Sequence, residues 1–285
     1  MSDQLAAALS GDVRVLLCDA DGNLFPSEEP AFDASAEVTN DFLASMGVRH
    51  SYTSRELRIA TTGKNFRATA LDLCRLHNVP VHPELSGPHP ARPLTGRRAR
   101  GRKVLSQVLL DGWVKVEQQT VSKHLGAVLR PDPGVGLPLT ELARHLTLAA
   151  VSSSAIVRLA TCFAATALTD LFPPDLTFSA EDSLPIPTSK PDPAIYQLVG
   201  ERLGCTGPQA LAIEDSLAGA RSAVAAGFPT VGNLQFVPPD ERAKREAALI
   251  EAGVLGVVGS WSELADAVLS RLRCDELATS PSKSY

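Results

Sequence analysis

The sequence lacks the residue patterns that mark several specialised classes of protein. Its five cysteines include no C-x-x-C pair, and its six histidines include no H-x-x-x-H pair. A scattered, odd set of cysteines argues against a disulfide framework and a zinc site, and it favours a reducing cytoplasm. Without a paired histidine motif, a histidine-based metal site is not expected either.

Membrane spans, secretory signals and a basic charge balance are missing as well. No apolar run approaches the roughly 18 residues that a membrane span needs. The segment MSDQLAAALSGD lacks the basic start and the long apolar stretch of a secretory signal. The formal net charge of −5 gives no global electrostatic reason to bind nucleic acid or an anionic membrane. We therefore expect a cytoplasmic globular protein, whose 285 residues suffice for one large domain or two smaller ones.

Short apolar runs recur along the chain, separated by segments that carry helix signals. The runs are apolar throughout, which is typical of strands in a parallel sheet covered on both faces. Asp192, Pro193 and Gly204 have the types and spacing of an N-cap, a first helical residue and a C-terminal stop. Ser260 and Glu263 have the spacing of a capping box. This alternation predicts a doubly wound α/β fold. The candidate strands are 13–18, 146–151, 176–179, 210–213 and 230–232.

A long segment between the first two candidate strands has a different character. Residues 31–129 contain no convincing strand run, and Thr53 with Glu56 has the spacing of a capping box. Connections in α/β domains are usually about 2–6 residues long, so an inserted, mainly helical domain is expected here. The expected boundaries are 1–26 and 131–275 for the α/β domain, 27–130 for the inserted domain and 276–285 for a flexible tail. Hinges are expected at 24–30 and 130–138.

A basic loop rich in proline and glycine lies inside this insertion, at residues 82–103. Two interpretations of it stay open. It is either a solvated surface loop, or some of its arginines meet an anionic substrate at the mouth of a site.

The carboxyl ends of the candidate strands carry side chains that suit one kind of chemistry. Ligands of open parallel sheets bind outside these ends, so the side chains are expected to converge. Four carboxylates together need a cation, and a ligand set made only of oxygens suits Mg²⁺. Lysine and serine suit phosphate oxygens, and a carboxylate nucleophile can carry a phosphoryl group. The side chains are Asp19 and Asp21, the serines at 152–154, Glu214 and Asp215, and Lys190 before a neighbouring helix.

In this order, DADGNL, VSSS, SKPDP and AIEDSLAGARSAVAAGF resemble the four motifs of the haloacid dehalogenase (HAD) superfamily. They are most similar to the subgroup of β-phosphoglucomutase-like and phosphoglycolate-phosphatase-like proteins. The resemblance covers residues 13–232 well and the insertion only by its position. It implies a Rossmann-like HAD core with an α-helical cap of the C1 type, and it implies phosphoryl transfer with Mg²⁺ as the cofactor.

Carried over by motif, the resemblance gives the carboxylates different roles. Asp19 would be the nucleophile that attacks phosphorus, and Asp21 would be the general acid and then the general base. Asp215, with Glu214, would bind Mg²⁺ together with the carboxylate of Asp19 and the backbone carbonyl of Asp21. Another Glu-Asp-Ser sequence, at 181–183, follows no apolar strand of this kind. The metal ligands are therefore placed at the later copy.

The resemblance also implies a cradle for the phosphate. Ser152 and Lys190 would bind the phosphoryl oxygens, and Ser153 is a further candidate because the register among the serines stays open. Gly22 permits a tight turn that brings the loop backbone close to the phosphate, and Asn23 is a further candidate for phosphate binding. Asn23 stands where the family commonly has threonine or another small β-branched residue, which leaves room for a different loop geometry or specificity.

An α-helical cap of this type closes over the site and contacts the substrate. The resemblance therefore makes Lys64 and Arg67, about one helical turn apart, candidates for substrate contact. The alternative is that both side chains belong to a solvated helix face.

Together these features predict a Mg²⁺-dependent phosphatase that hydrolyses a small phosphorylated metabolite, such as a sugar phosphate, through an aspartyl-phosphate intermediate. The presence of Asp21 argues against a haloalkanoate dehalogenase, which does not need this acid. Two alternatives remain. One is a phosphomutase of the β-phosphoglucomutase type, which passes the phosphoryl group to a sugar. The other is a non-catalytic phospholigand or nucleic-acid binder that uses the basic loop.

Overall fold

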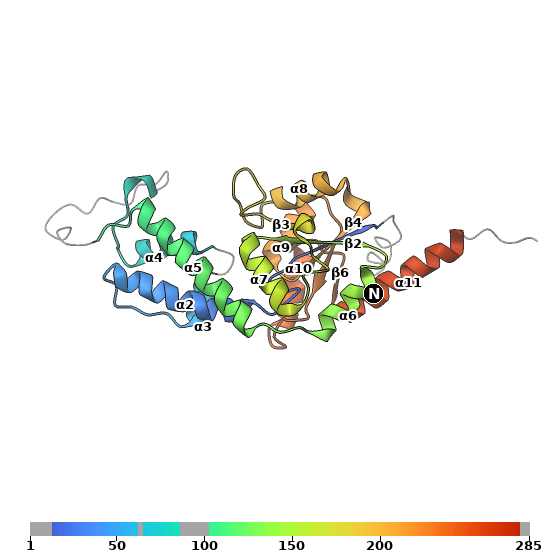
Figure 1. The fold of residues 1–285 in the computed structure, drawn as a ribbon, viewed down its shortest axis with the longest axis horizontal. Helices are drawn as coiled ribbons and strands as arrows, with labels where there is room; N and C mark the ends of the chain where they lie inside the picture. Colours follow the sequence, from blue (N-terminus) through green and yellow to red (C-terminus); the bar gives the residue numbers. More distant parts are fainter. Residues whose placement is uncertain (1–12, 62–64, 86–102, 280–285) are drawn as a thin grey trace, which may run out of the picture. The chain divides into compact units, whose positions relative to one another are not determined.

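Figure 1 shows the computed structural model of the chain, which describes residues 13–61, 65–85 and 103–279. Of residues 273–279 it describes the backbone alone. The chain forms two compact units, which we call the core unit (Met1–Ser27 with Leu129–Tyr285) and the inserted unit (Glu28–Val128). That these units correspond to the two domains expected from the sequence stays a prediction.

A six-stranded parallel sheet forms the centre of the core unit, in the order β3-β2-β1-β4-β5-β6. The chain enters in the middle of the sheet and builds outward in both directions, so the predicted doubly wound α/β fold is confirmed. The strands are β1 (Val15–Cys18), β2 (Thr147–Ser152), β3 (Thr177–Ser179), β4 (Ala210–Glu214), β5 (Thr230–Asn233) and β6 (Gly256–Val258). The sequence did not predict β6, because three residues that begin with glycine give too short a pattern.

Helices flank this sheet (Figure 1), and they are α6 (Pro133–Leu142), α7 (Ile156–Thr166), α8 (Ala194–Leu203), α9 (Leu217–Ala225), α10 (Arg242–Glu251) and α11 (Trp261–Thr279). On one face of the sheet, strand residues such as Leu17 pack with Ile195 of α8 and Ala223 of α9. Leu16 and Ile213 belong to the alternate positions, point to the other face and are fully buried as well. Burial on both faces explains why the strands are apolar throughout.

Helix ends in the core unit use several of the residues that the sequence indicated. The carboxylate of Asp192 accepts a hydrogen bond from the backbone N–H of Ala194 (2.9 Å) in the first turn of α8. Gly204 ends this helix with a left-handed φ of 59°, a conformation that glycine adopts without steric cost. The Ser260 hydroxyl accepts from the N–H of Glu263 (3.2 Å) at the start of α11.

Two expectations about segment boundaries need correction. The second half of the expected hinge at 130–138 is wrong, because α6 begins at Pro133 with Asp132 as its N-cap. Proline fits the first helical position, where its missing N–H has no partner to lose. The expected tail at 276–285 is also partly wrong, since the backbone of α11 continues to Thr279.

The inserted unit is built from helices, as the sequence predicted for this segment. They are α2 (Glu28–Ser45), α3 (Ser54–Thr61), α4 (Phe66–Leu76) and α5 (Gln107–Val128), with a 3₁₀ turn at Pro83–Leu85. Thr53 and Glu56 form a reciprocal capping box before α3, in which each side chain accepts from the other residue's backbone N–H. In the apolar core of the unit, the ring of Phe42 contacts those of Phe66 and Trp113 edge-on.

Some sequence-based expectations fall outside the described residues. These are Lys64, residues 86–102 of the basic loop and residues 280–285 of the tail. Among the helices that the structure does describe, none is long and apolar enough to cross a membrane.

Replacing Phe42 by alanine is expected to lower the free energy of unfolding by about 3–5 kcal/mol, because it removes a buried ring and leaves a cavity. Urea unfolding followed by circular dichroism measures the loss. Ile59→Ala is the control, since Ile59 is 72% exposed, and its effect should stay within about 0.5 kcal/mol. Equal losses in the two variants would contradict the packing described for Phe42.

Candidate active site

The carboxyl ends of β1 and β4 bring the acidic side chains together. The two strands are neighbours, and the N–H of Asp19 donates to the carbonyl of Ile213 (3.0 Å) where β1 ends. Asp19, Glu214 and Asp215 are all buried. Each offers one carboxylate oxygen to a group in which these atoms lie within 4.8 Å of one another. Three of the residues predicted from the sequence therefore form one acidic cluster.

Lys190 places a positive charge inside this acidic cluster. Its Nζ donates to Oδ1 of Asp19 (2.5 Å) and to Oε1 of Glu214 (2.6 Å). It also donates to the backbone carbonyl of Val151 in β2 (2.7 Å). An ammonium group has three N–H donors, and these contacts use all of them. The lysine predicted to bind phosphate thus lies beside the predicted nucleophile.

Tyr196 of α8 completes the surroundings of Glu214. Its hydroxyl donates to the same Oε1 (2.5 Å) that accepts from Lys190, and the Nζ of Lys190 lies 5.2 Å from the centre of the tyrosine ring. Burial raises the pKa of the Tyr196 hydroxyl well above its ordinary value, and the Glu214 carboxylate raises it further. The hydroxyl is therefore a donor to Glu214. No motif in the sequence indicates Tyr196, although it follows Lys190 by only six positions, on the helix that SKPDP precedes.

The charges in the cluster change the pKa values of its members. Burial raises the pKa of the Asp19 carboxyl well above its ordinary value; Lys190 opposes this effect, and Glu214 adds to the rise. Burial lowers the pKa of the Lys190 ammonium, but the carboxylates of Asp19 and Glu214 outweigh burial and hold it above its ordinary value. Asp19 and Glu214 thus share one ammonium group, and a further cation would offset the remaining repulsion among the three buried carboxylates.

The donor set of the cluster fits a divalent metal ion that prefers oxygen. Oε2 of Glu214 is buried, and the described residues offer it no hydrogen-bond partner. A buried charged oxygen without a partner costs free energy, which a bound cation would recover. Three carboxylates with no nitrogen or sulfur donor suit Mg²⁺ better than zinc or copper. The carboxylate of Asp21 lies outside this cluster of three, as expected for a residue that offers its backbone carbonyl.

Two glycines leave room for the carboxylates of the cluster. Gly22 has a φ of 81°, and a Cβ built on it would lie 2.5 Å from Oδ2 of Asp215. A Cβ on Gly219, in the first turn of α9, would lie 1.8 Å from Oε2 of Glu214. No side chain fits at either position without moving a carboxylate. The structure thus gives Gly22 a role beside Asp215, in addition to the turn predicted from the sequence.

Arg245 of α10 contacts Asp215 at one end of the cluster. Its Nη1 donates to the backbone carbonyl of Asp215 (2.8 Å) and lies 3.6 Å from the Oδ2 of the same residue. No motif signals such a contact, because α10 follows the last motif and meets Asp215 only in the folded chain.

Asp21 lies in a different environment from Asp19. Its Oδ1 accepts from the hydroxyl of Ser27 (2.5 Å) and from Nη2 of Arg158 (2.9 Å), while its Oδ2 accepts from the hydroxyl of Ser154 (2.6 Å). Burial raises the pKa of this carboxyl, but the guanidinium of Arg158 and the hydrogen bonds from Ser154 and Ser27 outweigh it. The net pKa of Asp21 is lower than its ordinary value. Arg158, on α7, was not found from the sequence.

Ser152, the last residue of β2, and the two serines that follow it have different contacts. The hydroxyl of Ser152 accepts from the N–H of Ser154 (3.0 Å) and lies 3.5 Å from Oδ2 of Asp21. The hydroxyl of Ser153 accepts from the backbone N–H of Lys190 (3.1 Å). Ser153 thus supports the loop that carries the lysine, and the prediction that its hydroxyl also binds phosphate stays a prediction. Ser152 lies next to Asp21 and keeps its candidacy.

The prediction that Asn23 binds phosphate is wrong for its side chain. Asn23 is fully buried, and its Nδ2 donates to the carbonyls of Asp19 (2.9 Å) and Ile213 (3.1 Å). Its Oδ1 accepts from Nδ2 of Asn233 at the end of β5 (2.8 Å). The backbone carbonyl of Asn23 accepts from Nε1 of Trp261 (2.8 Å). The side-chain amide of Asn23 therefore connects the loop after β1 to β4 and β5, and its backbone carbonyl connects the loop to α11. A threonine hydroxyl has one donor and could not supply both N–H groups.

Asp182 and Arg67 each have a local partner that does not belong to the acidic cluster. Asp182 of the earlier Glu-Asp-Ser sequence accepts from the backbone N–H of Ile156 (2.6 Å), so it caps α7. Arg67, a candidate for substrate contact, forms an ion pair with Asp111 (2.5 Å), and the two side chains are 39% and 49% exposed. Arg67 and Asp111 both lie in the inserted unit, so Arg67 has a local partner on a solvated surface.

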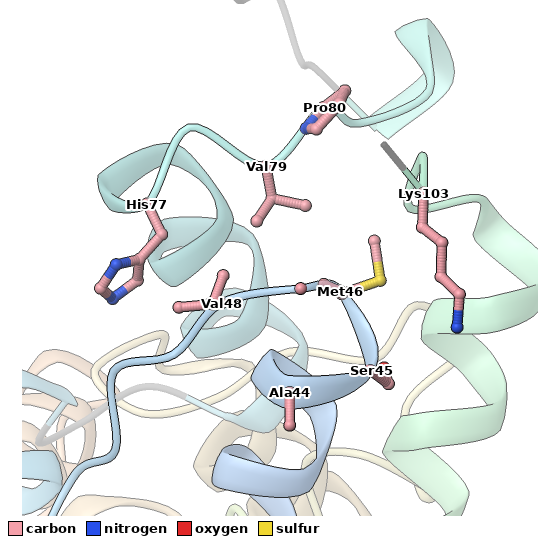
Figure 2. Close-up of a pocket in the computed structure, with 9 residues that line it drawn as sticks. Ala44, Ser45, Met46, Val48, His77, Val79, Pro80 and Lys103 are labelled. Carbon is pink, nitrogen blue, oxygen red and sulfur yellow. The ribbon is translucent and has the colours of Figure 1, made fainter. Parts of the chain in front are cut away.

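A hollow of about 360 Å³ lies in the inserted unit, between the end of α2 and the segment from His77 to Pro80. Figure 2 shows His77 and Lys103 on opposite sides of it. The remaining lining is mostly apolar, and the Tyr52 hydroxyl contacts Nε2 of His77 (2.8 Å). None of the candidate catalytic residues lines this hollow. The candidate catalytic residues all belong to the core unit.

Replacing Asn23 by alanine is expected to destabilise the protein by about 2–5 kcal/mol, because buried carbonyls and the amide of Asn233 lose their partners. Thermal unfolding of the two proteins measures the difference. Asn65→Ala is the matched control, since Asn65 caps the exposed start of α4 and should cost only about 1 kcal/mol. A smaller loss for Asn23→Ala than for the control would contradict the role given to this network.

The comparisons with known proteins agree with the geometry. A family model described as haloacid dehalogenase-like hydrolase matches residues 13–227. None of the curated proteins compared with the chain matches it.

Solved structures share the fold at low sequence identity. A candidate phosphoglycolate phosphatase from Haemophilus somnus matches with a TM-score of 0.63 and 17% identity, over 90% of this chain and 97% of its own. CbbY from Rhodobacter sphaeroides, solved with phosphate, matches with a TM-score of 0.61 and 20% identity, over 88% and 96%. A candidate β-phosphoglucomutase from Bacteroides vulgatus matches with a TM-score of 0.60 and 19% identity, over 96% and 100%.

Proposed function

Because the chain belongs to the haloacid dehalogenase-like hydrolases, we propose that it is a Mg²⁺-dependent phosphatase acting on a small phosphorylated metabolite. The observation that carries the proposal is the pair of aspartates in one loop with separate surroundings. Asp19 lies in the buried acidic cluster with Lys190, whereas Asp21 lies among hydroxyl groups and a guanidinium. One carboxylate can therefore react at phosphorus while the other handles protons.

In the proposed first step, a carboxylate oxygen of Asp19 attacks phosphorus. The bond between phosphorus and the leaving-group oxygen breaks, and Asp21, which enters this step as the protonated acid, supplies the proton that this oxygen takes up and is left as a carboxylate. The product alcohol leaves, and Asp19 carries the phosphoryl group as an aspartyl phosphate. Buried Lys190 offsets the negative charge beside the reacting carboxylate.

In the second step, Asp21 takes a proton from a water molecule whose oxygen attacks phosphorus. The bond between phosphorus and Asp19 breaks, inorganic phosphate leaves and both carboxylates return to their starting state. Ser152 lies 3.5 Å from Oδ2 of Asp21, which supports a role for its hydroxyl in holding the phosphoryl oxygens next to the acid.

The residues that would hold Mg²⁺ are Asp19, Glu214 and Asp215, together with the backbone carbonyl of Asp21. When bound, Mg²⁺ supplies positive charge to the phosphoryl oxygens as charge develops on them. Lys190 and Tyr196 both contact Oε1 of Glu214, so Oε2 is the oxygen of this residue that is left for a metal.

A phosphomutase is the second candidate, because it uses the same aspartyl phosphate. It would pass the phosphoryl group to a sugar hydroxyl instead of water. The likeness to a candidate β-phosphoglucomutase over 96% of this chain supports keeping it. The products distinguish the two functions: a phosphatase releases inorganic phosphate from a panel of phosphorylated metabolites, and a mutase yields an isomeric sugar phosphate.

The remaining parts of the proposal concern the substrate and the inserted unit. CbbY has been solved with xylulose 1,5-bisphosphate, and phosphorylated sugars are the substrate class that we propose here. We assign the inserted unit as a cap, because the chain enters it between the first and second strands. Contact of Lys64 or Arg67 with the substrate, and a cytoplasmic location, belong to the same proposal.

Asp19→Asn is expected to lower Mg²⁺-dependent hydrolysis of 4-nitrophenyl phosphate by a factor on the order of 10³ or more, because it removes the nucleophile. Colorimetric release of 4-nitrophenolate measures the rate. Asp170→Asn serves as the control, since Asp170 is exposed and should keep the full rate. Full activity of Asp19→Asn would refute the proposed mechanism.

Adding Mg²⁺ to chelator-treated protein is expected to raise its melting temperature, because the ion offsets repulsion among buried carboxylates. At a free Mg²⁺ concentration of about 100 times Kd, the stabilisation is about 2.7 kcal/mol. Differential scanning fluorimetry measures the shift without any substrate. Asp215→Asn should lose most of the shift and Asp170→Asn should keep it, so an unchanged shift in Asp215→Asn would sink the ligand assignment.

A further inference from the structure

Arg158 occupies a position that helix stability does not favour. It is the third residue of α7, which begins at Ile156. The first turn of a helix carries partial positive charge, so a cation there is unfavourable and an anion is favourable. The carboxylate of Asp182 already supplies that anion, at 2.6 Å from the N–H of Ile156. Stabilisation of α7 therefore does not explain the position of the guanidinium.

The partner of Arg158 is Asp21, across the end of the sheet. Nη2 of Arg158 lies 2.9 Å from Oδ1 of Asp21, and the two side chains are only 24% and 21% exposed. Partly buried charge pairs of this kind are stronger and better ordered than exposed ones. The pair joins α7 to the loop after β1, and both belong to the core unit.

The two oxygens of the Asp21 carboxylate have different neighbours. Oδ1 accepts from Arg158 and from the hydroxyl of Ser27. Oδ2 accepts from the hydroxyl of Ser154 and lies 3.5 Å from that of Ser152. A guanidinium has donors only, which keeps Oδ1 an acceptor, whereas a serine hydroxyl can either donate or accept. Only Oδ2 can therefore exchange hydrogen-bonding roles without losing an ion pair.

We propose that Arg158 is the positioning residue for the acid–base carboxylate of the enzyme. It fixes Oδ1 of Asp21 and thereby leaves Oδ2, on the side of Ser154 and Ser152, to exchange the proton with the substrate. This inference rests on the proposed phosphatase function and specifies one part of its site. Arg158 acts through Asp21 and does not itself bind the phosphoryl group.

Leaving-group dependence separates this role from a general structural one. Phenolate is a poorer leaving group than 4-nitrophenolate and depends more on a proton from the enzyme. Misplacing Asp21 should therefore slow phenyl phosphate more than 4-nitrophenyl phosphate. The ratio kcat/KM reports the steps up to transfer of the phosphoryl group to Asp19, so a change in the later hydrolysis does not obscure the comparison.

The experiment compares Arg158→Met, Arg158→Lys and Asp21→Asn with the unaltered protein on both substrates. In Arg158→Met, kcat/KM for phenyl phosphate should fall by a factor on the order of tenfold more than kcat/KM for 4-nitrophenyl phosphate. Arg158→Lys should recover part of this selectivity, because a cation remains near Oδ1. Arg144→Met is the control: Arg144 forms an exposed surface pair with Glu141 and should change neither rate.

A double variant tests whether Arg158 acts through Asp21. In the Asp21→Asn background, Arg158→Met should cause little additional loss, because the group that it positions is already gone. A further loss equal to that in the single variant would overturn the proposal, as would equal losses on both substrates. No change on either substrate would overturn it too.

Failure of the proposed function gives a separate result. If the unaltered protein hydrolyses neither ester, or if Asp19→Asn stays active, the phosphatase mechanism itself is wrong. If those tests succeed and Arg158→Met shows no selectivity, only the role of Arg158 is wrong. The Mg²⁺-dependent rise in melting temperature, which should persist in Arg158→Met, shows that the variant is folded with an intact acidic cluster.

Discussion

Lys190 contacts the ends of three neighbouring strands at once. Its ammonium group meets Val151 in β2, Asp19 after β1 and Glu214 in β4. Burying three carboxylates beside one another is unfavourable, and Lys190 offsets the charge of two of them, Asp19 and Glu214. The position of the proposed nucleophile, Asp19, therefore depends on a side chain that enters from a distant loop. That loop is in turn fixed by Ser153, whose hydroxyl accepts from the N–H of Lys190.

The other part of the site depends on the separation of the Asp21 carboxylate from the acidic cluster. Asp19 and Asp21 are separated by a single residue, yet one is surrounded by buried charges and the other by hydroxyl groups and a guanidinium. Gly22 makes the change of direction possible, since its φ of 81° suits glycine and a Cβ there would collide with Asp215. Two identical residue types thus acquire different chemistry from their neighbours alone.

The sequence predicted what is local or repeated in pattern, and it missed what depends on distant contacts. Strands β1 to β5, the acidic cluster and Lys190 were predicted because each forms or follows an apolar run or precedes a helix. Tyr196, Arg158 and Arg245 were missed because each reaches its partner only after the sheet has assembled. Asn23 was noticed as unusual, but its burial could not be inferred, since Asn233 and Trp261 lie more than 200 positions away. The prediction of a hinge at 130–138 was wrong in its second half, because Asp132-Pro133 starts a helix as readily as it makes a loop.

The two tryptophans of the chain are divided between the two units. Trp261 is fully buried, and its indole N–H holds the carbonyl of Asn23. Trp113 packs edge-on against Phe42 in the inserted unit. Each unit thus carries one indole fluorophore in a distinct environment. Removing one indole at a time would allow the emission of the other to follow its own unit separately, with no attached dye.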